Sequence, residues 1–351
     1  MRRAMLALPA AVMAVASCTA PAGDSLGPQP TTASPSPSRS ASPLASSPSP
    51  STARDPSFQE FAVPRGSRPH DVAPAPDGRV WYTAQGSGEL GVLDPSSGET
   101  RHVPLGSGSA PHGVIVGPDG APWITDSGLN AIVRVDPGSL AVRRFPLPGS
   151  RNVNLNTAAF DGAGILWFTG QAGFCGSLDP ASGAVRLFEA PRGRGPYGIA
   201  TTPAGDVWLS SLAGSYIAKV AAGPVQPVDV PTRGGGARRV WSDSRGRLFV
   251  TEWFAGMLAM YEPSTGAWKQ WRLPGANPQP YAVYVDERDV VWISDFGANA
   301  LVAFDPSVER FRAYPIPTRG ASVRQLLGRA GEVWGAESGA GKLVVLRTGA
   351  T

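Results

Sequence analysis

The sequence predicts an all-β protein, a seven-bladed β-propeller with four antiparallel strands in each blade. Three observations support that prediction. An aromatic residue recurs seven times at intervals of 41 to 44 residues, by subtraction of residue numbers. Each interval holds four short apolar runs separated by Gly, Pro and Asp turn signals. A period of about 42 residues with four strands per period is typical of propellers, in which each small sheet must stack on its neighbours.

The repeat is defined by its aromatic residues and is clearest between residues 111 and 148. The aromatic markers are Trp81, Trp123, Trp167, Trp208, Phe249, Trp292 and Trp334. In the clearest unit we expect strands at 114–116, 122–125, 131–135 and 142–147. Pro118-Asp119-Gly120 and Asp136-Pro137-Gly138 supply turns between them. The same acidic-Pro turn follows the marker by 13 residues in four of the seven units.

The two ends of the repeat region predict how the ring closes. The last unit supplies only three strands, the third at 342–347, and residues 58–63 resemble the fourth strands at 142–148 and 309–317. We therefore expect the segment 58–63 to complete the last blade. This pairing would remove an open sheet edge that could otherwise recruit other chains.

Residues 1–18 have the pattern of a targeting segment. Arg2 and Arg3 precede an apolar stretch that is short for a membrane span and typical of a secretory signal. The end of this stretch, Val15-Ala16-Ser17-Cys18, resembles the lipobox of bacterial lipoproteins and predicts a lipid-modified Cys18. An ordinary signal peptide cut near Ala20 is the alternative. The favoured interpretation is an exported protein, lipid-anchored to the bacterial cell membrane and facing outward.

Composition divides the rest of the chain and limits its partners. Residues 19–56 are rich in Pro, Ser and Thr and predict a disordered stalk, which leaves 57–351 as the propeller. The formal net charge is +4 without a Lys/Arg run in the repeat, so we expect no nucleic-acid partner and no membrane contact beyond the anchor. A monomer is expected. Cys175 would have no partner if Cys18 is lipidated, and is predicted to be a small buried hydrophobe.

Two sets of residues are expected at one mouth of the central channel. Because the first two strands of a blade run in opposite directions, the residue before the first strand and the residue after the second lie on the same face. The first set, which we call the mouth ring, is His70, His112, Asn156, Tyr197, Arg238, Tyr281 and Arg324. The second set, the flanking ring, is Ala84, Asp126, Gly170, Ser211, Glu252, Asp295 and Glu337. Blades differ here although their scaffold positions agree, which is typical of a site built on a repeat.

Several members of these rings have chemistry that suits a site. His70, His112 and Asp126 come from adjacent blades and could hold a divalent metal, or provide a base and its orienting group. The remaining members of the mouth ring are candidates for binding a ligand: Asn156, Tyr197, Arg238, Tyr281 and Arg324.

Three acidic members of the flanking ring have two interpretations. Glu252, Asp295 and Glu337 could bind a hard cation, or could pair with the interleaved Arg238 and Arg324 as salt bridges. Internal pairing is the favoured interpretation.

Four segments resemble the repeats of a known family. They are RPHDV…VWYTA (68–84), APHGVIVGPDGAPWITD (110–126), GPYGIATTPAGDVWLSS (195–211) and PQPYAVYVDERDVVWISDFGANALVAFDP (278–306). They are similar to the repeats of the virginiamycin B lyase, or streptogramin lyase, family over roughly residues 57–348. The resemblance implies a seven-bladed propeller. It also implies a Mg²⁺-assisted elimination that opens the cyclic depsipeptide streptogramin B at its ester.

The catalytic residues that the resemblance implies fall on four positions of this chain. Only the last, Glu337, keeps the family's residue type. Tyr281 stands where the sixth blade of the family has a His, Ser322 where the seventh has a Glu, and Arg324 where it has the general-base His. An arginine cannot accept a proton at neutral pH. A displaced version of the pattern, with His112 as base, would use the group in the first two blades described above.

Three functions are compatible with these observations. The favoured one is a surface-anchored propeller that binds a small molecule, a peptide or a protein at the mouth ring without catalysis. The second is a Mg²⁺-dependent streptogramin B lyase with His112 as base and Asp126 as metal ligand. The third is another metal-dependent hydrolase, such as a lactonase, that uses the acidic flanking residues.

Overall fold

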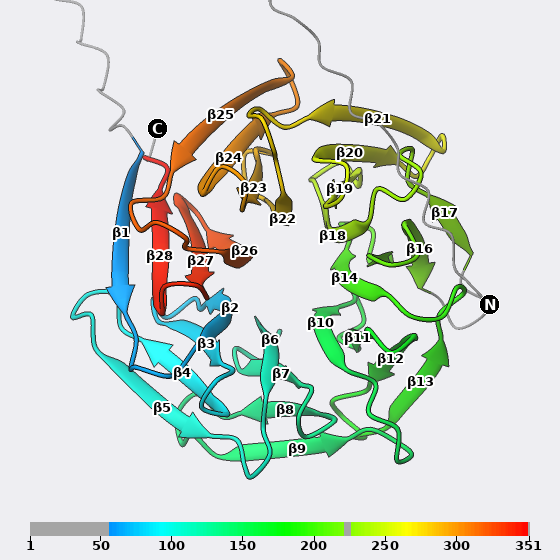
Figure 1. Ribbon diagram of the computed structural model, residues 1–351. Helices are drawn as coiled ribbons and strands as arrows, with labels where there is room; N and C mark the ends of the chain where they lie inside the picture. The colour runs from blue at the N-terminus through cyan, green and yellow to red at the C-terminus, as the bar shows by residue number, and fades with distance from the viewer. Residues whose placement is uncertain (1–55, 221–225, 350–351) are drawn as a thin grey trace, which may run out of the picture. The chain divides into compact units, whose positions relative to one another are not determined.

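A computed structural model of the chain describes residues 56–220 and 226–349. The predicted signal segment with Cys18, and the predicted stalk as far as residue 55, lie outside these residues. All regular elements of the described chain are β-strands, which form seven four-stranded antiparallel sheets around a central channel (Figure 1). Within the same residues there is no apolar helix of the length that a membrane crossing requires. The predicted seven-bladed propeller is confirmed.

Six blades are each one consecutive meander, and the seventh is completed by the first strand of the described chain. The innermost strands are β2 (Pro69–Pro74), β6 (Pro111–Val116), β10 (Leu155–Phe160), β14 (Pro196–Thr201), β18 (Ala237–Ser242), β22 (Pro280–Val285) and β26 (Val323–Arg329). The second strands are β3 (Val80–Ala84), β7 (Pro122–Asp126), β11 (Leu166–Gly170), β15 (Val207–Ser211), β19 (Leu248–Glu252), β23 (Val291–Asp295) and β27 (Glu332–Glu337).

The outer half of each blade follows the same order. The third strands are β4 (Glu89–Leu93), β8 (Ala131–Val135), β12 (Phe174–Leu178), β16 (Tyr216–Val220), β20 (Met257–Glu262), β24 (Ala300–Asp305) and β28 (Lys342–Arg347). The outermost strands are β5 (Thr100–Pro104), β9 (Val142–Pro146), β13 (Val185–Glu189), β17 (Pro227–Asp229), β21 (Ala267–Arg272), β25 (Arg310–Pro315) and β1 (Ser57–Ala62).

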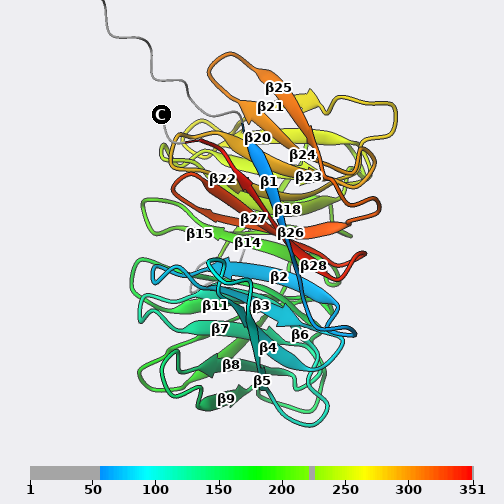
Figure 2. The same cartoon turned by 90° about the vertical axis from the view of Figure 1, so that its left-hand side faces the viewer.

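The first and last strands of the described chain close the ring, as the sequence predicts. β1 pairs antiparallel with β28 in the order β1-β28-β27-β26, and the two strands lie side by side in both ribbon views (Figures 1 and 2). Glu60 of β1 accepts hydrogen bonds from the backbone and hydroxyl of Thr318 and from Lys342 Nζ. Phe61 stacks on Trp334 with ring centroids 5.6 Å apart. The closure therefore combines a sheet ladder, an ion pair and aromatic packing.

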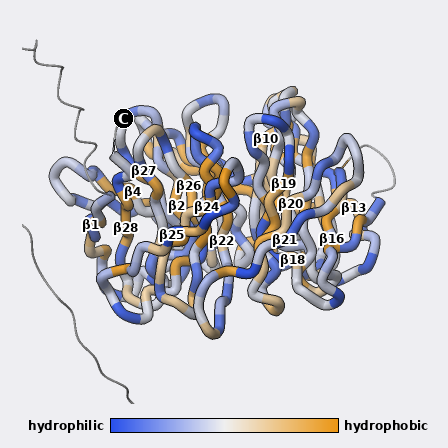
Figure 3. The backbone as a smooth tube through the Cα atoms, turned by 90° about the horizontal axis from the view of Figure 1, so that it is seen from above, coloured by the Kyte–Doolittle hydropathy of each residue, from blue (hydrophilic) through white to orange (hydrophobic). Residues whose placement is uncertain are grey.

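The core lies between the faces of adjacent sheets. Six of the seven aromatic markers are buried, and Trp81 and Trp334 are fully enclosed. Hydrophobic residues gather on the strands and hydrophilic residues on the connecting loops (Figure 3). Several of the marker indoles also donate a hydrogen bond to an aspartate in the turn between the first two strands of the blade. Trp123 Nε1 donates to Asp119, and Trp292 Nε1 donates to Asp286. One residue type thus fills the core and fixes the first hairpin of its blade.

A hydroxyl two residues after the marker joins neighbouring blades. In the second blade, Thr125 Oγ1 accepts the backbone N–H of Gly113 at 2.9 Å and donates to the carbonyl of Asn156 in the third blade. The same link to the carbonyl of a mouth-ring residue in the next blade is made by Thr83, Thr169, Ser210 and Thr251. These buried hydroxyls fix the backbone from which the mouth-ring side chains project.

Candidate functional site

The seven residues of the mouth ring occupy equivalent places in the fold. Each is the second residue of an innermost strand. In each blade a register shift between the first two strands falls beside this residue, as between Pro111 and Gly113 in β6. Such bulges redirect side chains and are frequent next to functional sites. Direct contacts link the ring members, so the structure brings the predicted ring together.

Two imidazoles lie against each other at one side of the ring. The ring centroids of His70 and His112 are 3.9 Å apart, and Asn156 Nδ2 lies 3.3 Å from His112 Nε2. Burial lowers the pKa of His70 well below its ordinary value, and the charges of nearby arginines such as Arg324 lower it further. Burial and the neighbouring His70 lower the pKa of His112 in the same way. Both imidazoles are therefore neutral at pH 7.

Asp71 is a member of this cluster that the sequence did not single out. A hydrogen bond of 2.7 Å joins its Oδ1 to His70 Nδ1, while its Oδ2 is buried without a hydrogen-bond partner. His70, Asp71 and His112 can place one ligand atom each within 4.8 Å of one another. Burial raises the pKa of Asp71, although the charge of Arg239 opposes that shift. In the sequence, Asp71 could have been found only from its position directly after the mouth-ring residue His70. That position matters because the bulge beside His70 redirects side chains.

The opposite side of the ring is built from tyrosines and arginines. The hydroxyls of Tyr197 and Tyr281 share a hydrogen bond of 2.5 Å, and Arg238 Nη2 donates to Tyr197 at 3.0 Å. The Arg238 guanidinium lies 3.6 Å from the centroid of the Tyr281 ring, and Phe296 stacks against that ring. Arg324 Nη1 approaches the Tyr281 hydroxyl at 3.5 Å. Two guanidiniums thus meet the same phenol.

These charges act on the two phenols unequally. Burial would raise the pKa of Tyr281, but the charges of Arg238 and Arg239 and hydrogen bonds from Tyr197 and Arg238 lower it below its ordinary value. Burial and the neighbouring Tyr281 raise the pKa of Tyr197 to about 12. Tyr281 is therefore the phenol on which negative charge is stabilised at this site.

Arg239 lies below the mouth ring and was also missed by sequence reasoning. It is 3% exposed, its Nη1 donates to Thr157 Oγ1, and its Nη2 lies 3.7 Å from Asp71 Oδ1. Its Nε and Nη2, like Nε of Arg238, have no hydrogen-bond partner among the described residues. In the sequence, Arg239 could have been found from its position directly after Arg238. The two consecutive arginines place one cation in the mouth ring and a second one deeper in the channel.

Asp126 does not join His70 and His112, contrary to the expected constellation. Its carboxylate is fully buried and accepts hydrogen bonds from the backbone of Ala110, Gly128 and Leu129, and from Ser109 Oγ. These bonds hold the loop that enters the blade to the turn after β7. The opposite directions of the first two strands correctly predict the end of the sheet at which Asp126 lies. They do not predict which way its side chain points.

The three other acidic residues of the flanking ring are also committed to their own blades. Glu252 accepts a hydrogen bond from Gln270, and Asp295 accepts the backbone N–H groups of Gln279 and Gly297. Glu337 lies near Glu60 and Lys342, towards the outer strands. None of the three pairs with Arg238 or Arg324 among the ion pairs of the described residues. The salt-bridge interpretation favoured by the sequence is wrong, and the three do not form one cation site in that part of the chain.

The cluster of two imidazoles and one carboxylate suits magnesium poorly. Mg²⁺ prefers oxygen ligands, and here only Asp71 supplies them. Three guanidiniums, those of Arg238, Arg239 and Arg324, contribute positive charge to the same channel end. The positions where the family resemblance places metal-binding carboxylates are Ser322 and Glu337, and Glu337 lies towards Glu60 and Lys342. The residues present therefore do not fit the metal that the resemblance implies.

The fold and the mouth ring together define a class: a seven-bladed propeller with a cluster of histidine, tyrosine and arginine side chains at one mouth of its channel. Comparison with known proteins identifies the family. The sequence profile described as the Virginiamycin B lyase family matches residues 99–350. The chain belongs to the virginiamycin B lyase family. No curated protein sequence is significantly similar to it.

Solved structures agree on the architecture. A selenomethionine-substituted virginiamycin B lyase from Staphylococcus aureus superposes with a TM-score of 0.78 at 19% identity, covering 84% of this chain and 99% of that one. A streptogramin B lyase structure gives a TM-score of 0.76 at 21% identity, covering 83% and 97%. A catalytically inactive histidine-to-alanine variant of the S. aureus enzyme with Quinupristin gives 0.77 at 19%, covering 84% and 99%. At these identities the likeness shows the fold alone.

Proposed function

We propose that this chain is a binding member of the virginiamycin B lyase family that holds a small anionic ligand at the mouth ring. The observation that carries the proposal is the charge of the channel. Arg238, Arg239 and Arg324 face the same cluster as one carboxylate, Asp71. Since both imidazoles are held neutral, they add no charge, and the site has an excess of positive charge.

The contacts favour a carboxylate as the ligand group. A guanidinium offers two parallel N–H donors that match the two oxygens of a carboxylate, and Arg238 keeps an unpaired Nε. The hydroxyls of Tyr197 and Tyr281 lie within the same cluster and could donate to a bound anion. Phe296 and Trp253 pack against the ring of Tyr281, which is buried. A small carboxylic acid, or the carboxylate end of a peptide, fits this arrangement.

The same residues argue against the family's elimination. That reaction needs a base that takes a proton from carbon, so that a double bond forms while the ester C–O bond breaks and the carboxylate leaves. Arg324 stands at the position of the base and stays protonated. Its Nε is bound to Ser338 at 2.7 Å, which fixes it as a donor. Arginine at this position stabilises negative charge instead of creating it.

Calorimetric titration tests the binding proposal. The propeller, residues 56–351, is titrated with succinate and with the neutral analogue succinamide at low ionic strength. We expect binding of succinate only, weakened at least tenfold by Arg238→Gln and by Arg324→Gln, because each removes a charge-assisted hydrogen bond. Arg101→Gln is the matched control, since Arg101 is exposed on the outermost strand β5. Equal affinity for succinamide, or equal losses in all three variants, would overturn the proposal.

A streptogramin B lyase is the second candidate, and family membership favours it. Quinupristin is the compound bound to the inactive S. aureus variant, so it is the substrate to try. We expect no ring opening in excess protein with Mg²⁺ or with EDTA. The linear product is an isomer, so chromatographic retention measures it. Ring opening that requires Mg²⁺ and is lost in His112→Ala would establish a lyase with its site displaced to the first two blades, and would replace the binding proposal.

Export and lipid anchoring belong to the same proposal and are supported by the sequence of residues 1–18. The full chain, expressed in a bacterium, should partition with the membrane fraction and should incorporate a radiolabelled fatty acid. Cys18→Ser should abolish both. Labelling that persists in Cys18→Ser would contradict the assignment of this residue. The anchored propeller is expected to be a monomer, which sedimentation of residues 56–351 would check.

A further inference from the structure

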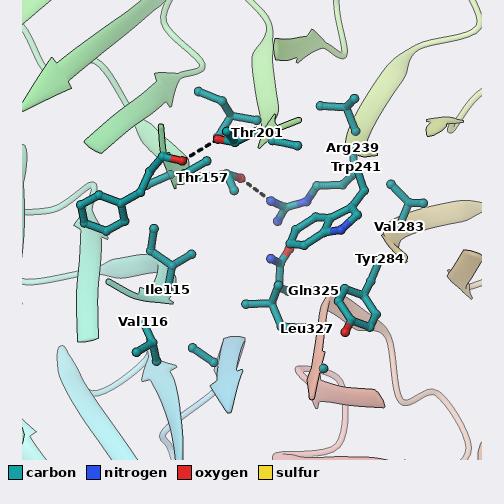
Figure 4. A pocket seen from close by; sticks show the side chains of 18 of the residues that line it. Ile115, Val116, Thr157, Thr201, Arg239, Trp241, Val283, Tyr284, Gln325 and Leu327 are labelled. Carbon is teal, nitrogen blue, oxygen red and sulfur yellow. Dashed lines mark hydrogen bonds between the residues drawn. The ribbon is translucent and has the colours of Figure 1, made fainter. Parts of the chain in front are cut away.

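A hollow lies at the end of the channel opposite the mouth ring. It has a volume of about 470 Å³ and is lined by the later residues of the innermost strands (Figure 4). In β6 the mouth-ring residue is His112, while Ile115 and Val116 line the hollow. The hollow also reaches Thr157, Arg239 and Gln325, each directly after a mouth-ring residue, and Ile115 and Val116 lie three and four residues beyond His112. We call this hollow the far cavity.

The walls of the far cavity are apolar and incompletely covered. Ile115, Val116, Phe160, Trp241 and Leu327 line it and are only partly buried. Trp241 meets Tyr284 edge to face, with ring centroids 5.4 Å apart. Exposed apolar surface is unfavourable in water, at roughly 25 cal/mol for each Å². A concave apolar wall of this size, with aromatic rings at one side, has the features of a small-molecule pocket.

One cation reaches the inner end of the far cavity. Figure 4 shows the guanidinium of Arg239 extending across it towards Thr157, with Gln325 nearby. Arg239 is 3% exposed, and its Nε and Nη2 have no hydrogen-bond partner among the described residues. Asp71, 3.7 Å from Nη2, is the one described carboxylate that forms an ion pair with it, and no hydrogen bond joins them. A buried guanidinium with free donors is costly unless a ligand satisfies it.

We propose that the far cavity binds a small amphipathic anion, with an apolar body against Trp241 and Leu327 and an acidic head group directed at Arg239. The volume suits such a body, and the charge at the inner end matches the head group. This site shares no lining residue with the mouth ring. Arg239 also adds to the positive charge of the mouth ring, so the two proposals have this one cation in common. Arg238 and Leu327 each belong to only one of the two sites, and variants at these positions separate the proposals.

Fluorescent probes test this site on residues 56–351. The first probe is 8-anilinonaphthalene-1-sulfonate, and the second is N-phenyl-1-naphthylamine, which has the same aromatic body without the sulfonate. We expect Arg239→Gln to weaken the sulfonate tenfold to a hundredfold and to leave the neutral probe unchanged, the size of effect of a charge-assisted hydrogen bond. We expect Leu327→Trp, which fills the cavity, to weaken both probes.

Three comparisons decide the result. Decanoate should displace the bound sulfonate, whereas decanamide at the same concentration should not. Arg238→Gln, which alters the mouth ring, should leave both probes unaffected. The proposal is overturned if Leu327→Trp leaves binding of the sulfonate unchanged. It is also overturned if Arg238→Gln abolishes that binding, because the probe would then sit at the mouth ring. Leu327→Trp keeps Arg239 and so tests the site even if Arg239→Gln does not fold.

Discussion

Replacement of Thr125 by valine tests how the blades position the mouth ring. Thr125 is 1% exposed, and its hydroxyl accepts from Gly113 and donates to Asn156, which is itself fully buried. Valine keeps the shape but leaves one N–H and one C=O without a partner. Each unsatisfied buried group costs about 1–3 kcal/mol, so Thr125→Val should lower the free energy of unfolding by roughly 2–6 kcal/mol.

Serine at the same position is the matched control. Thr125→Ser keeps the hydroxyl and removes one methyl, which should cost about 1 kcal/mol. Guanidinium chloride unfolding, followed by tryptophan fluorescence, measures both variants, and the comparison uses midpoints at equal m-values. If Thr125→Val costs no more than Thr125→Ser, the hydroxyl does not hold the blades together and our account of how the ring is positioned is wrong.

Three further predictions concern the rest of the propeller. Burial and the nearby charge of Glu60 raise the pKa of Glu337 from 4.5 to about 8, so the folded state binds this proton more tightly. Stability should then fall as pH rises through that window, and Glu337→Gln should flatten the fall in a series of unfolding curves. Removing residues 1–62 deletes β1 and exposes the edge of β28, so light scattering should detect aggregation that a chain starting at residue 56 does not show. Burial raises the pKa of the Cys175 thiol to about 11, and Ellman's reagent should not react with it before unfolding; prompt reaction would contradict the enclosed environment.

The fold could be predicted in detail because the repeat carries it. The strands expected at 131–135 and 342–347 are β8 and β28 with the same bounds, and the closing segment differs from β1 by one residue at each end. The first strand of the second blade was expected to start at residue 114, but β6 begins at Pro111. Pro111 pairs with Asp126 beyond the bulge, and hydropathy gives no sign of that pairing.

The site could be predicted only to the level of backbone position. The period places seven residues at one mouth, and the structure brings them together. The period of the repeat does not give the directions of the side chains. Asp126 was therefore expected beside the imidazoles, where Asp71 lies instead. Arg239 and the far cavity were not foreseen either, because they depend on what lies inside the channel below the ring. Periodicity describes what the blades share, whereas a site depends on where each side chain points.

The central claim is that the mouth ring is an anion site made by arginines. The most direct measurement is a crystal of residues 56–351 soaked in selenate and examined by anomalous scattering. We predict a selenium peak within hydrogen-bonding distance of Arg238 and Arg324. The claim would be contradicted by a crystal whose channel mouth is open but shows no such peak. Binding of soaked Mn²⁺ between His70, Asp71 and His112 in that crystal would indicate a metal-dependent site instead.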